Sequence, residues 1–214
     1  MTDTKPLLIL GAGSFAIEVL EVAELTGVRV AGFVVSDDHV PAARRHADLR
    51  IFAEGELPFA PDEVALIGGI VTTRRRAFVA RMANRGFAFR TLVHPSAIVS
   101  PRVRIDAGTF VGAGVIVASH THVGAHVLLN RGANVGHDNA LAPFVTIGPG
   151  AILAGAVRVG AGSYVAVGAV VRDHLEIGAG AVVAAGAVVV KPVEAHALVA
   201  GVPATVVKNG VDGL

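Results

Sequence analysis

Residues 97–120 read AIVSPR VRIDAG TFVGAG VIVASH, and the same pattern of six residues continues without insertion to residue 192. Sixteen consecutive hexads begin at Ala97, and the third position is Val, Ile or Leu in all of them, from Val99 to Val189. The fourth position is Gly or Ala in eleven of the sixteen. A repeat of this regularity decides the fold of the second half of the chain.

A strict period of six with one aliphatic residue per repeat predicts a parallel β-helix. Each hexad supplies one short strand and one corner, and the aliphatic side chain fills the narrow interior. Three hexads close one triangular coil of about eighteen residues, so the repeat makes about five coils. Residues eighteen positions apart are therefore expected to lie above one another.

The first half of the chain predicts a small α/β unit. Apolar runs at 6–12, 28–35 and 64–70 are expected to be strands, and the stretches 14–25 and 73–84 are expected to be helices. This alternation of strand and helix favours a parallel sheet. We therefore expect a Rossmann-like domain at residues 1–92, followed by a β-helix domain with a C-terminal tail at residues 93–214.

The turn GAGSFA (11–16) joins the first predicted strand to the first predicted helix in a G-x-G-x-x-A pattern. Glycines at such a turn allow a phosphate to approach the helix N-terminus closely. An acidic residue about twenty positions further on typically contacts a ribose, and Asp37 and Asp38 lie near that distance. Packing alone also explains glycines at this kind of turn. About 90 residues suit a half-size nucleotide domain better than a full dinucleotide fold.

Composition excludes several classes of protein. Of the 214 residues, 53% are hydrophobic but only 5% aromatic, none is cysteine, and the formal net charge is +1. Disulfides and thiolate metal sites are therefore excluded, and residues 74–76 (RRR) are expected to be the solvated start of a helix rather than a nucleic-acid surface. No apolar run reaches the roughly 20 residues of a membrane span. The N-terminus lacks the features of a signal peptide, so we expect a cytoplasmic protein.

The hexad ANVGHD (133–138) places a histidine and an aspartate at a corner of the predicted β-helix. Val135 points inward, and His137 and Asp138 follow it in the fifth and sixth positions, where side chains face outward. Stacking by eighteen puts Ser119 on one side of His137 and Gly155 on the other, and it puts His120 beside Asp138. Imidazole, with a reference pKa near 6.5, is suited to accept a proton near neutral pH. A neighbouring carboxylate fixes its tautomer and stabilises the imidazolium.

The repeat, the stretch TLVHPSAIVSP (91–101) and the closing ALVAGVPATVVK (197–208) resemble the hexapeptide-repeat acyltransferases. With ILGAGSFA (9–16), the resemblance extends over nearly the whole chain. It points to the sugar acetyltransferases of the sialic acid O-acetyltransferase type, which include N-acetyltransferases of nucleotide-linked 4-amino sugars. The resemblance implies a left-handed β-helix, a homotrimer, and acetyl-CoA as cosubstrate in the cleft between neighbouring helices. It also implies direct acetyl transfer to the amine of a nucleotide-linked 4-amino-deoxy sugar.

The resemblance assigns roles to individual residues. His137 and Asp138 match the catalytic pair at a subunit interface, with His137 as general base. The residues implied to pack against acetyl-CoA are Gly155, Val167, Ala185 and Gly186, and the Gly155 N–H is a candidate donor to the oxyanion. The residues implied to bind the nucleotide sugar are Gly13, Ser14 and Phe15 at the phosphates, Asp37 and Asp38 at the base or ribose, and Gly68 at the sheet edge.

Two departures from the family pattern leave the nucleotide base and the acceptor open. The chain has GFVVSDD (32–38) where the family often has GFLDD, and Thr146 stands where relatives often carry a histidine near the acceptor. Asn130 occupies a fourth position usually held by a small residue, where it either forms an asparagine ladder or touches substrate.

Three other functions remain open: O-acetylation of a sugar such as sialic acid, transfer to another amine, and a non-catalytic trimeric scaffold. An exposed, inert His137 is the alternative to a catalytic one. His120, His122 and His126 precede His137 at a spacing that suggests metal ligands, but they fall on different hexad positions. We therefore expect no metal site.

Overall fold

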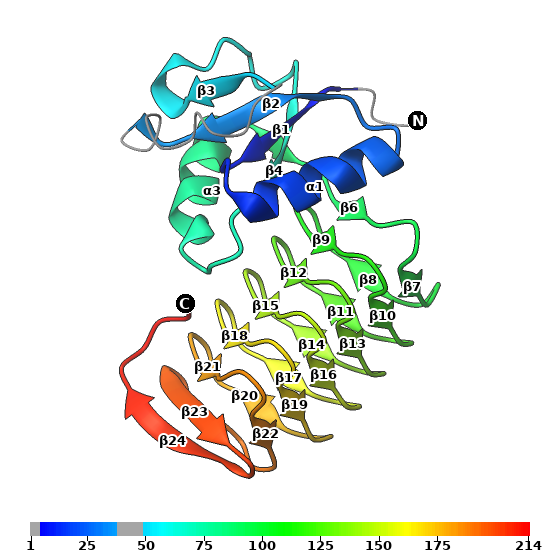
Figure 1. Cartoon of the computed structure of the whole chain (residues 1–214), viewed down its shortest axis with the longest axis vertical. Helices are drawn as coiled ribbons and strands as arrows, with labels where there is room; N and C mark the ends of the chain where they lie inside the picture. Colours follow the sequence, from blue (N-terminus) through cyan, green and yellow to red (C-terminus); the bar gives the residue numbers. More distant parts are fainter. Residues whose placement is uncertain (1–4, 38–48) are drawn as a thin grey trace.

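The computed structural model describes residues 5–37 and 49–214. The N-terminal part of the described chain contains a five-stranded parallel sheet in the order β3-β2-β1-β4-β5 (Figure 1). Its elements are β1 (Leu7–Leu10), α1 (Ser14–Leu25), β2 (Val30–Val35), β3 (Ile51–Ala53), the 3-10 helix η2 (Glu54–Glu56), β4 (Ala65–Gly68), α3 (Arg75–Asn84) and β5 (Ala88–Phe89). The predicted strands and helices are confirmed, whereas the short β3 and β5 were not predicted.

The sheet is buried on both faces because β1 carries an apolar side chain at every position. Leu7 and Ile9 pack with α1 on one face, and Leu8 and Leu10 pack with α3 on the other. All four side chains are at most 1% exposed. A parallel strand covered by helices on both faces requires this continuous apolar run rather than an alternating one.

The rest of the described chain is a parallel β-helix that confirms the six-residue frame. Each strand of the repeat occupies the second and third positions of a hexad and pairs with strands eighteen residues away, as Val117 pairs with Val99 and Val135. The third-position side chains of the inner coils form one continuous buried core. The interior is therefore a column of aliphatic residues, as the sequence predicts.

The repeat forms three sheets, one on each side of the triangular coil (Figure 1). The first contains β6 (Leu92–Val93), β9 (Phe110–Val111), β12 (Leu128–Leu129), β15 (Thr146–Ile147), β18 (Tyr164–Val165), β21 (Val182–Val183), β23 (Ala197–Gly201) and the antiparallel β24 (Ala204–Asn209). The second contains β7 (Ile98–Val99), β10 (Ile116–Val117), β13 (Asn134–Val135), β16 (Ile152–Leu153), β19 (Val170–Val171) and β22 (Val188–Val189). The third contains β8 (Arg104–Ile105), β11 (His122–Val123), β14 (Ala140–Leu141), β17 (Arg158–Val159) and β20 (Glu176–Ile177).

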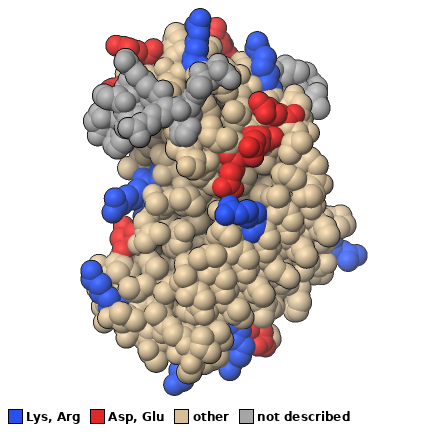
Figure 2. Space-filling model, in the orientation of Figure 1, with Lys and Arg blue, Asp and Glu red and all other residues tan. Residues whose placement is uncertain are grey.

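The second-position side chains point outward and give the three sides different surfaces. The first side, here called the covered face, lies under the N-terminal sheet, because Phe110 and Leu128 belong to the same core cluster as α1. The second, the apolar face, exposes Ile98, Ile116 and Ile152, which are between 39% and 66% exposed. The third, the charged face, exposes the polar side chains of Arg104, His122, Arg158 and Glu176. In the view of Figure 2, charged side chains on the β-helix are scattered and sparse.

The sixth position of the hexads turns the corner in the left-handed backbone region. Glycine occupies this position at many corners, but His120, His126, Asp138, Phe144, Ala156 and His174 adopt it with φ between 56° and 64°. Such φ values are unfavourable for residues with a Cβ atom. The side chains at these six corners therefore stand where glycine would be easier to accommodate.

Arg75 joins the N-terminal sheet to the β-helix. Its Nη1 donates to the carbonyl oxygens of Val71 (3.2 Å) and Thr72 (3.0 Å) and to Thr146 Oγ1 (2.8 Å). Its Nη2 donates to the carbonyl oxygens at 126, 144 and 145, at 3.0–3.1 Å. The prediction that residues 74–76 are solvated is wrong for Arg75, which is 2% exposed.

The charge of Arg75 is held by neutral oxygen atoms. Burial, with a smaller contribution from Arg76, lowers the pKa of Arg75 to about 9, so the guanidinium stays charged at neutral pH. Thr146 Oγ1 accepts one of its bonds and itself donates to the Val71 carbonyl at 3.2 Å. Six hydrogen bonds from Nη1 and Nη2 to backbone and hydroxyl oxygens stabilise the charge without a carboxylate, and the buried Nε has no hydrogen-bond partner among the described residues.

The chain following β24 returns to the start of α3. The Thr73 N–H and hydroxyl both donate to the Leu214 carbonyl, at 2.8 and 2.9 Å, and the hydroxyl accepts the Leu214 N–H at 3.0 Å. These bonds connect the C-terminal residue, which follows the last coil, to the N-terminal part of the molecule. None of the helices within residues 5–37 and 49–214 is long and apolar enough to cross a membrane.

His126 is half-buried at the same junction. Its ring stacks on Phe144 with centroids 4.9 Å apart and meets the Phe89 ring edge-on at 4.7 Å. Burial first, and then the charge of Arg75, lowers the pKa of His126 from 6.5 to about 4. The folded chain therefore excludes a proton that the unfolded chain binds between these two values.

We expect the stability of the protein to fall as the pH falls from 6.5 to 4, in part because of His126. His126→Phe keeps the ring stack and removes the titration, and Phe144 shows that this fold accepts phenylalanine at a sixth position. Urea unfolding midpoints at pH 7 and pH 5 should differ less for the variant than for the wild type. Equal pH dependence of the two proteins would contradict this assignment.

Candidate active site

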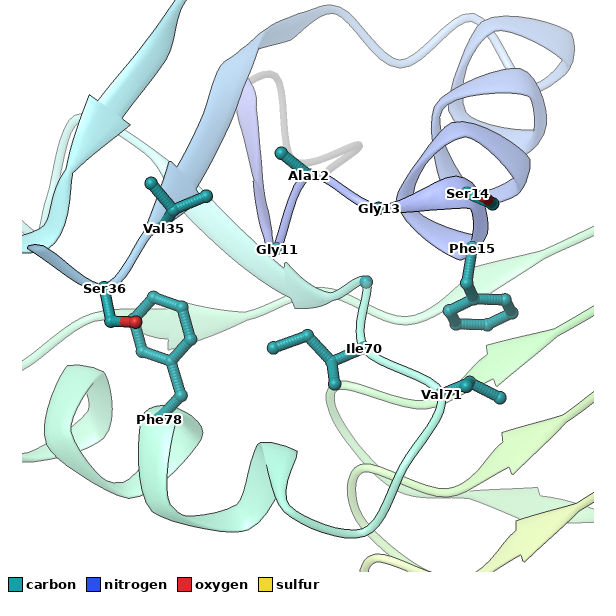
Figure 3. Close-up of a pocket in the computed structure, with 11 residues that line it drawn as sticks. Gly11, Ala12, Gly13, Ser14, Phe15, Val35, Ser36, Ile70, Val71 and Phe78 are labelled. Carbon is teal, nitrogen blue, oxygen red and sulfur yellow. The ribbon is translucent and has the colours of Figure 1, made fainter. Parts of the chain in front are cut away.

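A cavity of about 570 Å³ opens at the carboxyl ends of β1 and β4. Its lining residues are Gly11, Ala12, Gly13, Ser14, Phe15, Val35, Ser36, Gly69, Ile70, Val71 and Phe78. Figure 3 shows the turn from Gly11 to Phe15 on one side and Ile70, Val71 and Phe78 on the other. The chain runs from β1 to β2 on one side of β1, and β4 lies on the other side of β1. The cavity is therefore at the switch point of the sheet, where open α/β sheets bind ligands.

Three of the predicted nucleotide-contacting residues, Gly13, Ser14 and Phe15, line this cavity at the N-terminus of α1. None of the lining residues that the structure describes carries a charged side chain, and the first N–H groups of the helix give this part of the wall a positive polarity. Gly68 is buried in β4 just before the lining begins, and Gly69 forms the wall instead. The cavity therefore combines an apolar wall with an anion-binding helix end.

The acidic residues after β2 lie differently. Asp37 is exposed, and its Oδ1 accepts a hydrogen bond from the Gly55 N–H at 3.0 Å. Val35 and Ser36, rather than Asp37, line the cavity from this strand. Asp38 lies outside the described residues.

The His137–Asp138 pair lies at the corner between the apolar and charged faces. His137 Nδ1 is 2.7 Å from Asp138 Oδ2, and the two side chains are 66% and 56% exposed. With Nδ1 engaged by the carboxylate, Nε2 is the ring nitrogen free to accept a proton. The frame predicted both the corner and the outward direction.

The neighbours of the pair are those that stacking by eighteen predicts. The Asp138 N–H donates to the Ser119 carbonyl at 3.0 Å, and His120 Nδ1 lies 3.9 Å from Asp138 Oδ1. On the other side, a Cβ atom added to Gly155 would lie 2.6 Å from His137 Nε2. The imidazole therefore lies directly over a residue that has no side chain.

The residues expected at acetyl-CoA fall on two different corners. Val167, Ala185 and Gly186 are exposed at the corner between the covered and apolar faces, where the Gly186 N–H donates to the Val167 carbonyl at 2.9 Å. Gly155 lies with His137 at the other edge of the apolar face. The two groups thus border the same face from opposite edges and are separated in a single chain.

The cavity and His137 are also separated in a single chain. The N-terminal sheet lies against the covered face, whereas His137 lies at the corner opposite that face, between the other two. A triangular cross-section places such a corner as far as possible from the covered side. One chain therefore does not bring its own His137 to its own cavity.

Asn130 and Thr146, whose roles the sequence leaves open, are both buried. Asn130 is 4% exposed, and its Oδ1 accepts the Arg131 N–H at 2.8 Å. Thr146 is fully buried, and its hydroxyl is used by Arg75 and Val71. Among the residues that the structure describes, no group of three His, Cys, Asp or Glu side chains is placed to hold a metal ion.

Sequence reasoning missed part of the cavity wall. Gly69 and Ile70 are the last two residues of the third predicted strand and directly follow β4, and the rule that ligands bind beyond the carboxyl ends of strands was a usable signal for them. Phe78 and Arg75 gave no such signal, since an aromatic or basic residue in a helix has many possible surroundings. Their roles depend on where α3 packs.

No protein-family model matches the chain, and no curated protein matches it. Solved structures do match over nearly the whole chain. One of them is perosamine N-acetyltransferase from Caulobacter crescentus, solved as a variant with one histidine replaced by asparagine, in complex with CoA and GDP-perosamine. It is 33% identical to this chain, the match covers 95% of this chain and 97% of that chain, and the TM-score is 0.88. The acetyltransferase domain of PglB from Neisseria gonorrhoeae, in complex with acetyl coenzyme A, is 31% identical, with 95% and 100% covered and a TM-score of 0.86.

WeeI from Acinetobacter baumannii shares the fold at 24% identity, with 95% and 100% of the two chains covered and a TM-score of 0.85. The repeat, the small α/β unit and the full-length similarity to two sugar acetyltransferases at more than 30% identity agree with one another. The chain therefore belongs to the hexapeptide-repeat sugar acetyltransferases, and it is an acyltransferase with a left-handed parallel β-helix.

Proposed function

We propose that the chain is an acetyl-CoA-dependent N-acetyltransferase that acts on the amine of a nucleotide-linked 4-amino-deoxy sugar. The observation that carries the proposal is the His137–Asp138 pair, with Nδ1 bound to a carboxylate and Nε2 free above a glycine. The similarity in fold and sequence to a perosamine N-acetyltransferase in complex with CoA and GDP-perosamine supports this choice of substrate class.

The nucleotide part of the substrate is assigned to the N-terminal domain, residues 1–92. The first N–H groups of α1, at Gly13, Ser14 and Phe15, bind the diphosphate, and the apolar cavity wall contacts the base. Asp37 and Asp38 stay assigned to the base or ribose, and Gly68 supports the neighbouring wall. The second domain, residues 93–214, carries the acetyl transfer.

The reaction in this proposal needs no covalent enzyme intermediate. The free amine of the sugar attacks the thioester carbonyl of acetyl-CoA, and His137 Nε2 takes the proton that the amine loses. Asp138 holds the ring and stabilises the imidazolium. The Gly155 N–H, which donates no hydrogen bond within residues 5–37 and 49–214, stabilises the oxyanion. Collapse breaks the C–S bond, and the imidazolium returns its proton to the departing thiolate.

The complete site requires more than one chain, and we assign it to a homotrimer. The cavity and His137 lie on opposite sides of one coil, so a neighbouring chain must supply one of them. The apolar face, with Ile98, Ile116 and Ile152 exposed, is the surface that such a neighbour would cover. Its edges carry His137 with Gly155 on one side and Val167 with Ala185 on the other.

Acetyl-CoA fits between these edges once two chains lie side by side. The small residues Gly155, Ala185 and Gly186 leave room for the narrow pantetheine arm, and Val167 gives it an exposed apolar contact. The thioester then lies beside His137 of one chain, while the rest of the cosubstrate follows the corner of the next. Acetyl-CoA in the neisserial relative and CoA in the Caulobacter relative support this cosubstrate.

The proposal is tested by mass spectrometry of products from acetyl-CoA and a panel of acceptors. The panel contains 4-amino-deoxy sugars linked to UDP, dTDP and GDP, together with free amino sugars and sialic acid. We expect acetylation on nitrogen of at least one nucleotide-linked member. Acetylation of a free sugar hydroxyl alone would favour the O-acetyltransferase function, and no turnover of any acceptor would favour a binding scaffold.

We expect His137→Asn to lower kcat by roughly 10²- to 10⁴-fold, because a general base contributes about that much. The KM for the nucleotide sugar should change little, since the cavity is untouched. His122→Asn is a matched control, because His122 is also exposed and paired with a carboxylate, at 2.8 Å from Asp106. Steady-state kinetics of both variants provide the measurement, and unchanged kcat in His137→Asn would remove the mechanism.

We expect Ile116→Lys to dissociate the trimer, because a charge in the centre of a buried apolar face loses its hydration. Light scattering after size exclusion should give about three times the 21.7 kDa chain mass for the wild type and the chain mass for the variant. The variant should lose turnover but keep nucleoside diphosphate binding. Ala140→Lys, at the second position on the charged face, should remain trimeric. A wild-type monomer with full activity would contradict the assignment.

A further inference from the structure

We propose that Asn139 is a positioning residue for acetyl transfer, which holds the turn carrying His137 and Asp138 against the turn carrying Gly155. This inference rests on the function proposed above, and neither the motif nor the resemblance singled out this residue. Asn139 directly follows the catalytic pair, in the first position of the next hexad. Its side chain is 1% exposed, so it does not touch substrate.

The side-chain amide of Asn139 binds both turns. Its Nδ2 donates to the Gly136 carbonyl at 2.8 Å, in its own turn, and to the Ala154 carbonyl at 2.9 Å, one coil further on. Its Oδ1 accepts the Val157 N–H at 2.6 Å. Ala154 and Val157 are the two ends of the turn that contains Gly155. One side chain therefore fixes both ends of that turn relative to the catalytic pair.

A second side chain, Thr121, reinforces the link from the preceding coil. The Thr121 hydroxyl donates to the same Gly136 carbonyl at 2.8 Å and accepts the Asn139 N–H at 3.1 Å. Thr121, Asn139 and the turn at residues 154–157 thus form a continuous network across three successive coils. All of the hydrogen-bonding groups of the Asn139 side chain are used.

Other corners of the β-helix do not need an amide at this position. Thr109 and Ser163 are also buried in first positions, and each donates a single hydroxyl bond to the carbonyl fifteen residues on, at 2.8 and 2.7 Å. A hydroxyl is therefore sufficient to connect successive coils. The sixteen first positions contain one asparagine, and it lies beside the catalytic pair. The additional bonds serve the catalytic corner.

The geometry explains what this link controls. His137 Nε2 lies 2.6 Å from the position that a Cβ atom of Gly155 would occupy, so a small shift between the two turns changes the position of the base relative to the oxyanion donor. Both groups act on the same tetrahedral carbon, and their joint position affects the transition state more than substrate binding. Loosening the link should therefore lower kcat and leave KM nearly unchanged.

The test compares Asn139→Thr with Ser163→Ala. By the precedent of Thr121, Asn139→Thr keeps a bond to the Ala154 carbonyl and one from the Val157 N–H, and it loses the bond to the Gly136 carbonyl in the turn of the catalytic pair. Ser163→Ala removes the bond to the Gly178 carbonyl at a corner without the catalytic pair. We expect both variants to have a lower Tm. Only Asn139→Thr should have a lower kcat, by about tenfold or more. Its KM for both substrates should stay within about twofold of the wild-type value, and its affinity for nucleoside diphosphates should be unchanged. Equal kcat in both variants would overturn the inference.

A second variant keeps the test decisive if Asn139→Thr does not fold. Thr121→Val removes the other bond to the Gly136 carbonyl while preserving volume, and we expect the same split between kcat and KM. Wild-type protein and His137→Asn are measured in parallel. If His137→Asn loses activity while Asn139→Thr and Thr121→Val keep the wild-type kcat, only the role of Asn139 is overturned. Absence of wild-type turnover on any nucleotide amino sugar overturns the proposed function itself.

Discussion

Aliphatic side chains at the third position of the hexads, together with small and aliphatic side chains at the first position, fill the interior of the β-helix. The position of every other residue in this half of the molecule depends on them. The inner column is continuous from coil to coil and almost fully excluded from water. A shift of the frame by a single residue would move polar side chains inward and expose the column. Because the frame is fixed in this way, the corner that each exposed side chain occupies is also fixed.

The same constraint separates the two parts of the site. The N-terminal sheet must cover the side that carries Phe110 and Leu128, because those outward side chains are apolar and pack with α1. His137 is then held at the opposite corner. The separation follows from packing and makes an active site from two chains a geometric requirement of the proposed function. The six hydrogen bonds of Arg75 hold the N-terminal sheet, and with it the cavity, in a fixed position against the coils.

Much of this arrangement could be predicted from the sequence because the β-helix is governed by a local period. The frame gave the strands, the outward direction of His137 and Asp138, and the neighbours Ser119, His120 and Gly155. The periodic pattern also gave α1 from Ser14 to Leu25. Features that depend on packing between the two halves could not be predicted. Arg75 was expected in solvent, and only the position of α3 against the coil shows why it is buried. Asn139 resembled any polar corner residue until its partners were known.

The requirement for two chains is tested most directly by complementation in mixed trimers. His137→Asn is coexpressed with Gly13→Trp, a substitution directed into open space at the cavity wall. Each variant alone should be inactive. In a random equal mixture, half of the chains have a free cavity and the other half have an intact His137. The two meet at one half times one half of the interfaces, so about a quarter of wild-type turnover should return. If the mixture is as inactive as its components while trimers form, cavity and histidine act within one chain, and the account is contradicted.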